Sequence, residues 1–198
     1  MAEGKSPAST GGKIIVLSAP SGSGKSTLIK KLLDRGDLNL QFSVSATNRK
    51  PREGEQDGVH YHFLTTDEFR RAIDEDRFVE WEEVYPGGYY GTLKSEIDRK
   101  IASGINVVLD IDVKGGLNVK KLYGDRALTI FIQPPSRGEL ERRLRVRGTE
   151  TEEAITDRIG KAEYELSFAP RFDTIVVNDN LETAAADLHN IITNFISH

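Results

Sequence analysis

Apolar and polar positions along the chain follow two alternating patterns. Short runs of apolar, often β-branched residues occur at 14–17, 106–112 and 127–132. Such runs predict strands that are buried on both faces of a parallel sheet. Between them, apolar residues recur every three or four positions, which predicts amphipathic helices. A last apolar run at 173–177 and a closing helix from Leu181 continue the alternation, so we expect an α/β protein with helices on both faces of the sheet.

The middle of the chain, from about residue 45 to 96, breaks this rhythm. Its apolar segments are short, aromatic and alternating, which predicts half-buried strands. A strand expected at 41–45 leads into this part, and further strands are expected at 59–64 and 78–81. Thr65 and Glu68 have the spacing of a capping box and open a predicted helix. We therefore expect a small mixed or antiparallel subdomain inserted into the parallel core.

Composition and charge exclude several classes of protein. The 198 residues are expected to form one compact unit with an inserted part. The net charge of −4 is spread along the chain, which disfavours a nucleic-acid-binding surface. The absence of cysteine excludes disulfides and thiolate metal sites. Because no apolar run approaches a membrane span and the start lacks the apolar core of a secretory signal, we expect a cytoplasmic protein.

The first predicted strand leads into a glycine-rich loop and a helix start. The loop, Ser-Gly-Ser-Gly-Lys-Ser-Thr at 21–27, carries little side-chain bulk. Successive backbone N–H groups and a helix N-terminus in this order form a concave site for phosphate groups. Lys25 would reach the outer phosphates, and the Ser26 hydroxyl would bind Mg²⁺. The pattern G-x-x-x-x-G-K-[ST] is incomplete, because Ala19 replaces its first glycine, and an ordinary Gly/Ser turn is the alternative.

Charged residues in two other segments fit the same chemistry. Asp110 ends a predicted buried strand, as the Mg²⁺-associated aspartate of P-loop enzymes does, and Asp112 follows on the same side. Either carboxylate could instead cap the following helix. Arg49 and Arg52 flank Lys-Pro in a polar loop, where two guanidinium groups could clamp a phosphate dianion. A solvated charged loop is the alternative for these arginines.

The order and spacing of several segments resemble the guanylate kinase family. The segments are 45–55, Tyr61, 80–81, 89–92, 109–112, 148–153 and 175–178. The resemblance covers nearly the whole chain from Lys13. It implies a P-loop NTPase fold with a three-layer core, a parallel sheet, an inserted GMP-binding subdomain and a helical lid. It also implies transfer of the γ-phosphate of ATP to GMP, with Mg²⁺ required, to give ADP and GDP in purine nucleotide metabolism.

The resemblance also implies a division of the chain. The first part, 1–12, is expected to be a flexible tail, and 13–198 the guanylate kinase-like domain. Within this domain the core is expected to comprise 13–44, 97–135 and 168–198, the GMP-binding insertion 45–96, and the lid 136–167.

Particular residues receive roles from the same resemblance. The implied ATP-binding residues are Ala19, Pro20, Ser21, Gly22, Ser23, Gly24, Lys25, Ser26, Thr27, Arg147 and Asn178. The implied GMP-binding residues are Ser45, Arg49, Arg52, Tyr61, Glu80, Tyr90, Thr92 and Asp112. The expected catalytic residues are Lys25, Arg49, Arg143, Arg147 and Arg158, and Mg²⁺ is expected at Ser26 and Asp110.

Glu80 is the residue expected to select guanine. A carboxylate can accept hydrogen bonds from the N1–H and the exocyclic amine of guanine together, whereas adenine has no N1–H. Because Glu82 and Glu83 are neighbours, Glu80 could also be an exposed strand residue. Thr92 could equally be only the N-cap of a helix.

The basic segment that would form the lid allows two interpretations. Arg143 and Arg147 are four residues apart and share a helical face, with Arg158 on the next helix. The resemblance implies that this segment is a mobile lid that closes on ATP. Arg142 and Arg145 are expected to face solvent. The alternative is that the whole charge-rich hairpin is only a solvated surface.

Four residues are weighed against plain structural roles. His60 and His62 alternate on one predicted strand, but no third metal ligand is evident, so surface positions are expected. Trp81 is expected to pack rather than to stack on a base. Asn178 matches an adenine-side contact of the family, and a simple turn residue is the alternative.

Two positions depart from the family pattern. Asn48 replaces the threonine that is usual before the first arginine of the loop. The turn Pro86–Gly88 is longer than the usual Gly-Asn before the paired tyrosines. Neither change removes a GMP contact, but both leave the loop geometry at the guanine pocket open.

The expected reaction needs no general base, because the acceptor phosphate oxygen is already ionised near neutral pH. Catalysis would come from aligning two polyanions and neutralising their charge. The alternatives are a kinase for AMP or dTMP and a non-catalytic interaction module; a regulatory GTPase is disfavoured, since no Asn-Lys-x-Asp segment is present. The expected partners are GMP and ATP, without nucleic acid or membrane, and the expected state is a monomer or homodimer.

Overall fold

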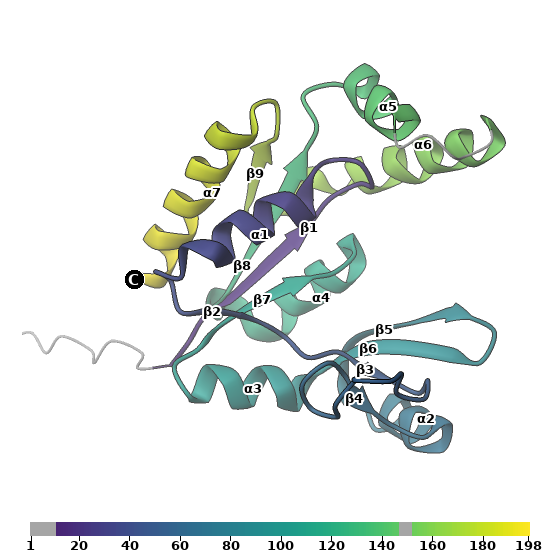
Figure 1. Cartoon of the computed structure of the whole chain (residues 1–198). Helices are drawn as coiled ribbons and strands as arrows, with labels where there is room; N and C mark the ends of the chain where they lie inside the picture. Colours follow the sequence, from purple (N-terminus) through teal and green to yellow (C-terminus); the bar gives the residue numbers. More distant parts are fainter. Residues whose placement is uncertain (1–10, 147–151) are drawn as a thin grey trace, which may run out of the picture.

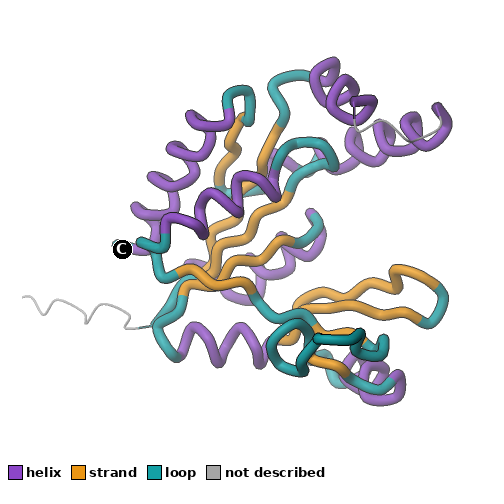
Figure 2. Tube along the Cα trace, viewed as in Figure 1, coloured by secondary structure: helices purple, strands orange, loops and turns teal. Residues whose placement is uncertain are grey.

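A computed structural model describes residues 11–146 and 152–198 of the chain. Five parallel strands form the central sheet, in the order β2-β7-β1-β8-β9. They are β1 (Ile14–Ser18), β2 (Leu40–Phe42), β7 (Asn106–Asp110), β8 (Ala127–Gln133) and β9 (Thr174–Val177). Helices lie on both faces of this sheet (Figure 1), and its strands are seen side by side in Figure 2. The predicted α/β fold with a parallel sheet is confirmed.

The helices follow the strands in the predicted alternation. They are α1 (Lys25–Arg35), α2 (Thr66–Asp74), α3 (Lys94–Ala102), α4 (Val113–Tyr123), α5 (Arg137–Val146), α6 (Glu152–Leu166) and α7 (Leu181–Ile196). Short 3₁₀ turns, η1 (Gly124–Arg126) and η2 (Ala169–Arg171), precede β8 and β9. Helix α7 begins after Asn180, whose side-chain oxygen accepts hydrogen bonds from two backbone N–H groups of the first turn.

Alternate residues of β1 pack against opposite faces of the sheet. Ile15 belongs to a hydrophobic cluster with Leu28 of α1 and residues of α7. Val16 belongs to a second cluster with Ile97 of α3 and residues of α4. All residues of β1 are buried, which explains the continuous apolar run in the sequence. The rigid sheet thereby fixes the point from which the glycine-rich loop departs.

A second, four-stranded sheet forms the inserted part, in the order β4-β3-β6-β5. Its strands are β3 (Ala46–Thr47), β4 (His62–Phe63), β5 (Phe78–Tyr85) and β6 (Gly88–Leu93). The pair β3–β4 is parallel, whereas β3–β6 and β5–β6 are antiparallel. Phe69 of α2 stacks on Phe78 in a hydrophobic cluster of its own. The capping box of Thr65 and Glu68 is confirmed.

Three predicted strands have other boundaries in the structure. The strand expected at 41–45 is interrupted: β2 ends at Phe42, and β3 begins at Ala46. The strand expected at 59–64 shrinks to β4, because a turn at Gly58 (φ 73°) occupies its start. The strand expected at 78–81 extends to Tyr85, since β6 pairs with it along that length.

Helices α5 and α6 form a small unit with a separate core. Leu140 and Leu144 of α5 pack with Ala162 of α6. Ser136 caps α5 by accepting a hydrogen bond of 3.1 Å from the N–H of Glu139, as its spacing predicted. In Figure 1 the α5–α6 pair and the second sheet both lie toward the end at which the arrow of β1 points. This is the end of a parallel sheet at which ligands bind in open α/β proteins.

The described chain is packed from Gly12 onward. The N–H of Gly12 donates a hydrogen bond of 2.7 Å to the carbonyl of Ile101, and a Cβ at this position would collide with the carbonyl of Ile105. Gly12, which was predicted to belong to the tail 1–12, is therefore held by the core, and residues 1–10 lie outside the described part.

Candidate active site

The P-loop joins β1 to α1 in a backbone conformation that suits glycine. Gly22 and Gly24 have φ angles of 89° and 84°, in the left-handed region. Helix α1 begins directly afterwards, and the first turn of a helix has N–H groups without intrahelical partners. The loop and this turn line a cavity of about 400 Å³, which we call the P-loop cavity. All nine residues predicted from 19 to 27 line it.

Asn178 supports this loop from the end of β9. Its side-chain nitrogen donates a buried hydrogen bond of 2.7 Å to the carbonyl of Ser23, and its backbone N–H donates one of 2.7 Å to Gln133. A Cβ on Gly24 would collide with the Asn178 amide, so glycine is needed there for space as well as for φ. Asn178 is 5% exposed and also lines a neighbouring cavity of about 360 Å³. It is therefore more than the turn residue that the sequence alone allowed.

One face of α6 closes the P-loop cavity on its other side. Arg158, Lys161 and Glu165 are spaced by three and four residues, and all three line the cavity. The predicted position of Arg158 near the ATP phosphates fits this arrangement. Lys161 and Glu165 were not singled out on the sequence, because surface helices rich in charge carry many such residues.

Arg143 lies apart from the P-loop cavity. Its Nε donates a hydrogen bond of 2.7 Å to Glu139, and its Nη2 donates one of 3.1 Å to the carbonyl of Asn178. Hydrogen bonds from Arg142 and Arg143 lower the pKa of Glu139 to about 2. Arg143 lines the neighbouring cavity next to Gly22 and Gly24 instead. Arg147, also predicted to act on ATP, lies outside the described residues.

Arg142 and Arg145 of α5 are surface residues, as predicted. The Arg142 side chain is 64% exposed and pairs with Glu139. Arg145 is 43% exposed and bridges Glu141 of its own helix to Glu152 of α6. Exposed pairs of this kind contribute little stability, typically below about 1 kcal/mol each.

A second cavity of about 590 Å³ lies between the inserted sheet and α4. We call it the Glu80 cavity. Of the predicted GMP-binding residues, four line it: Ser45, Glu80, Tyr90 and Asp112. Its other walls come from 73–84 of the insertion, from Gly91, from 110–111, and from Lys114, Gly115 and Asn118.

Glu80 and Thr92 face each other across paired strands. Their Cα atoms are register partners on β5 and β6, and the Thr92 hydroxyl donates a hydrogen bond of 2.6 Å to Glu80 Oε1. Burial raises the pKa of Glu80; the Thr92 hydrogen bond opposes this shift, and the charge of Asp112 adds to it. Thr92 does not cap α3, whose N-cap is Leu93 and lacks a side-chain cap. Glu80 is therefore not an exposed strand residue, and Thr92, which does not line the cavity, holds the Glu80 carboxylate instead of capping the helix.

Asp112 caps helix α4 and also lines the Glu80 cavity. Strand β7 ends at Asp110 rather than at Asp112, so the expected strand 106–112 is too long. Asp112 is the N-cap of α4, and its Oδ1 accepts a hydrogen bond of 2.7 Å from the N–H of Gly115. Its carboxylate also lines the Glu80 cavity. Capping fixes the carboxylate at the edge of the cavity, because the helix start supplies the hydrogen bond.

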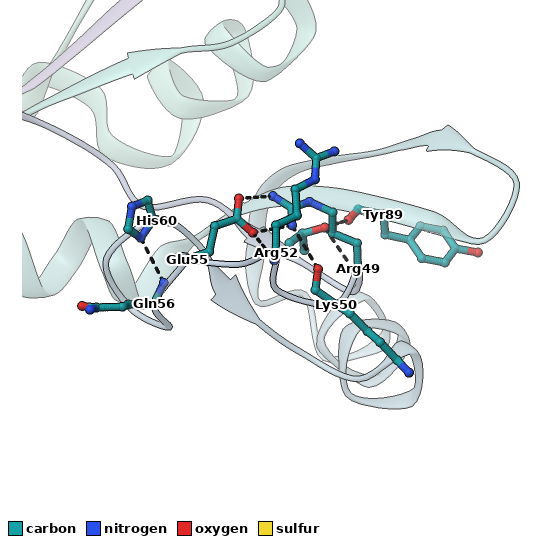
Figure 3. A network of polar contacts seen from close by, with 8 residues as sticks. Arg49, Lys50, Arg52, Glu55, Gln56, His60 and Tyr89 are labelled. Atoms are coloured by element: carbon teal, nitrogen blue, oxygen red, sulfur yellow. Dashed lines mark hydrogen bonds and ion pairs between the residues drawn. The ribbon is translucent and has the colours of Figure 1, made fainter.

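A carboxylate that the sequence did not single out holds the arginine loop. Glu55 accepts hydrogen bonds of 2.6 and 2.7 Å from both terminal nitrogens of Arg49, and one of 2.7 Å from the backbone N–H of Arg52 (Figure 3). These bonds lower the pKa of Glu55 to about 2, with the Arg49 side chain as the largest cause. The same pairing raises the pKa of Arg49. The loop is thus internally braced rather than loosely solvated.

Aromatic rings line the other side of Arg49. Its guanidinium carbon lies 4.8 Å from the ring centre of Tyr61 and 5.5 Å from that of Phe63. Tyr61 and Tyr90 meet edge to face at 6.0 Å, and a hydrogen bond with Tyr90 contributes to the raised pKa of Arg49. The structure therefore brings Arg49, Tyr61 and Tyr90 together, as the resemblance implied, with Arg52 on the same loop.

The two departures from the family pattern contact each other. The Asn48 side chain donates to the carbonyl of Gly87 at 2.8 Å and to Thr66 at 2.9 Å. It accepts a hydrogen bond of 2.8 Å from the N–H of Tyr89. Asn48 thus ties the start of the arginine loop to the longer Pro86–Gly88 turn, directly before Tyr90. An asparagine supplies both a donor and an acceptor for this purpose.

His62 and Trp81 make contacts that their predicted roles, a surface position and plain packing, did not include. His62 lies 3.3 Å from the buried carboxylate of Glu96 on α3, so it links the inserted sheet to the core. Glu96 also pairs with Arg99 and Lys100. Trp81 meets Tyr89 edge to face at 6.2 Å, but it is 46% exposed and lines the Glu80 cavity. Among the described residues, no group of three or more side chains of His, Cys, Asp or Glu could hold a metal by itself.

The two cavities adjoin at one ion pair. Lys25 of the P-loop cavity pairs with Asp110, which lines the Glu80 cavity. The pair forms because β1 and β7 are neighbours and Leu17, at the end of β1, is in register with Asp110. The P-loop and the half-buried Glu80 thus line two cavities that share one junction, and the rings of Tyr61 and Tyr90 connect Arg49 to the second of these cavities. This arrangement can align two phosphorylated molecules.

Comparisons with known proteins agree with this geometry. The family model described as guanylate kinase matches residues 11–195. A guanylate kinase of Bacteroides fragilis is 57% identical over 93% of this chain and 90% of the relative. One of Porphyromonas gingivalis is 52% identical over 93% and 98%. The crystal structure of guanylate kinase from Anaplasma phagocytophilum is 31% identical, with a TM-score of 0.69 over 96% of this chain and 88% of that one. Within the described ranges, no helix is long and apolar enough to span a membrane.

Proposed function

The chain belongs to the guanylate kinase family and transfers the γ-phosphate of ATP to GMP, and we propose that the P-loop cavity binds ATP while the Glu80 cavity binds GMP. The products are ADP and GDP. The observation that carries this assignment is the ion pair of Lys25 with Asp110, which joins the two cavities. With this assignment, the phosphate donor and the acceptor would bind on two sides of one junction.

For the acceptor side we propose that Arg49 and Arg52 bind the GMP phosphate together with Tyr61 and Tyr90. The bracing of Arg49 by Glu55 supports this, because a guanidinium held in advance loses less freedom when a phosphate binds. Guanine would lie against Glu80, Thr92, Asp112 and Ser45. The half-buried Glu80 supports selection, since a buried acceptor without a partner disfavours adenine.

For the donor side we propose that residues 19–27 hold the phosphates of ATP, with Lys25 on the transferred group. Arg158 would add positive charge from α6, and Arg143 and Arg147 would do so after a movement of the lid. The acceptor oxygen of GMP is ionised near neutral pH, so no side chain has to remove a proton. Alignment and charge neutralisation then supply the catalysis.

The residues present fit a bound Mg²⁺. Ser26 lies at the start of α1, and the Asp110 carboxylate lies beside Lys25 at the end of β7. Hydroxyl and carboxylate oxygens suit Mg²⁺, which keeps several waters and takes phosphate oxygens as further ligands, so a large protein cage is not required. We propose that these two residues hold the ion, which would neutralise charge on the phosphates.

The insertion and the lid are proposed to move toward each other when both substrates bind. Their separate hydrophobic clusters, around Phe69 and around Leu140, support this view, because each part can keep its packing while its position changes. The division into core 13–44, 97–135 and 168–198, insertion 45–96 and lid 136–167 is part of the proposal. A cytoplasmic location, a monomeric or homodimeric state and the absence of a nucleic-acid partner stay predictions.

Separate binding measurements test the assignment of the two cavities. We expect Lys25→Met to abolish turnover and weaken ATP binding while GMP binding is retained. Arg49→Met should weaken GMP binding and leave ATP binding intact. Lys30→Met, an exposed position on α1, serves as the control. If Lys25→Met weakened GMP binding and spared ATP, the assignment would be wrong.

The other functions weighed on the sequence are not favoured. Relatives that are 50–57% identical over more than nine-tenths of this chain are named guanylate kinases rather than AMP or dTMP kinases. The complete P-loop cavity and the braced Arg49 disfavour a non-catalytic module. Two adjoining cavities, one for each substrate of the proposed transfer, support the kinase instead.

A further inference from the structure

A carboxylate lies in the cavity that is proposed to bind the phosphates of ATP. Glu165 lines the P-loop cavity together with Lys161 and Arg158 of the same helix face. The opposite wall consists of the P-loop and the first turn of α1, with Lys25. Such a wall attracts anions through its N–H groups, its lysine and the positive end of the helix dipole. A glutamate is therefore not the residue type that this cavity should present to a polyphosphate.

The surroundings of Glu165 give it no other obvious reason to be there. It lies in the last turn of α6, where the negative end of the helix dipole disfavours a carboxylate. Burial raises its pKa, and the charge of Asp112 raises it further. The charges of Lys161 and Lys25 and the backbone N–H of Ser21 lower it. Its favourable interactions thus come from the groups that a phosphate chain would use.

We propose that Glu165 is the resident anion of the donor site, which the phosphates of ATP displace, and that it thereby sets the affinity for ATP. This inference rests on the proposed assignment of the P-loop cavity to ATP. Two anions cannot occupy this positively charged cavity together without repulsion, so the carboxylate has to leave when a triphosphate enters. In the empty cavity its negative charge offsets part of the positive charge that Lys161, Arg158 and Lys25 contribute.

The consequence is a donor site that binds nucleotides less tightly and releases them more readily. Each ATP that binds has to replace a contact already made, which weakens net binding. When ADP leaves, the Glu165 carboxylate takes its place, which lowers the free-energy cost of removing an anion from a strongly positive cavity. Glu165 would not affect GMP binding in the same way, because it does not line the Glu80 cavity.

The test is the affinity for ATP in the variant Glu165→Gln. The amide keeps the shape of the side chain and removes its charge. We expect the KM for ATP, measured in the kinase reaction, to fall about fivefold, with the KM for GMP unchanged. The Kd for ADP, measured by calorimetry without GMP, should fall by the same factor. Inorganic tripolyphosphate should show the same gain, because it presents phosphates without adenine. Glu163→Gln, on the outer face of the same helix and paired with Arg137, is the matched control and should behave like the wild type.

A second variant covers the case in which Glu165→Gln folds poorly. Glu165→Asp keeps the charge but withdraws it by one methylene from Ser21, and its KM for ATP should lie between those of the wild type and Glu165→Gln. An unchanged or higher KM for ATP in both variants would overturn the inference. If Lys25→Met bound ATP like the wild type, the assignment of the cavity itself would fail, so the two failures are distinguishable.

Discussion

The hydroxyl of Thr92 donates a hydrogen bond of 2.6 Å to Glu80 Oε1 from the register-paired position on the neighbouring strand. Thr92 is 2% exposed, so this bond is shielded from water. The pairing of β5 with β6 thus fixes the direction of the carboxylate that is proposed to bind guanine. The strand pairing alone orients the Glu80 carboxylate, because its hydrogen bond with Thr92 forms without a ligand.

Thr92→Val should weaken the recognition of GMP. Valine has the same shape as threonine but cannot donate to Glu80, so the carboxylate loses its fixed orientation and its pKa rises further. We expect kcat/KM for GMP to fall about tenfold, mostly through KM, which corresponds to one lost hydrogen bond to a charged group. The KM for ATP should stay the same.

The control for this substitution is Thr193→Val. The Thr193 hydroxyl also donates a hydrogen bond, to the carbonyl of His189 on α7, far from both cavities. Steady-state kinetics with varied GMP are the measurement. Equal losses in the two variants would mean that a general loss of stability, rather than the orientation of Glu80, is responsible.

Glu55→Gln should weaken the phosphate clamp of the arginine loop. The amide can accept only part of the hydrogen bonds that the carboxylate takes from Arg49 and from the N–H of Arg52. We expect the KM for GMP to rise about tenfold, with kcat changed less than about threefold. Glu53→Gln, an exposed neighbour in the same loop, should leave both constants unchanged.

The same variant should change how stability depends on pH. Folding lowers the pKa of Glu55 from its ordinary value near 4.5 to about 2. An acid with a lowered pKa stabilises the fold above its unfolded pKa, and this contribution is lost as the pH falls toward the folded value. Between about pH 4.5 and 2 the wild type should therefore lose more unfolding free energy than Glu55→Gln. Urea titrations at several pH values measure this difference. Parallel curves of unfolding free energy against pH for the two proteins would contradict the prediction.

Asn178→Ala should loosen the P-loop. The substitution leaves the carbonyl of Ser23 without its buried donor, which costs about 1–3 kcal/mol of unfolding free energy. Because the loop binds phosphates through backbone groups, the KM for ATP should rise several-fold while the KM for GMP does not change. Asn190→Ala on the exposed face of α7 is the control for thermal melting and kinetics. A rise in the KM for GMP alone would argue against this role of Asn178.

The sequence predicted the centre of the parallel sheet well, because β1, β7 and β8 are largely buried on both faces. Ile14–Leu17 could hardly be anything but a strand before a glycine-rich loop, and the structure places β1 there. The inserted part was predicted less well, since strand length there depends on pairing. β5 continues through the exposed Val84 and Tyr85 because β6 lies beside it, and no apolar run signals this.

Side-chain partners within the site were the hardest to predict. Glu55 is one acidic residue among several in a polar loop, and only the folded loop brings it to Arg49. The partnership of His62 with Glu96 joins residues 34 positions apart, which local patterns cannot reveal. Glu80 and Thr92 were suggested by the family resemblance, whereas their mutual hydrogen bond follows from strand register.

The most direct test of the account is the acceptor preference of Glu80→Gln. The account proposes that the ionised Glu80 selects guanine, and ADP release can be measured with GMP, with AMP and without acceptor. We predict that kcat/KM for GMP falls about a hundredfold in Glu80→Gln, and that it stays at the wild-type level in the control Glu75→Gln. Because burial raises the pKa of Glu80, wild-type activity with GMP should also decline on acidification from a pH above that of an ordinary glutamate, and Glu80→Gln should lack this decline. Unchanged kcat/KM for GMP in Glu80→Gln would contradict the central claim.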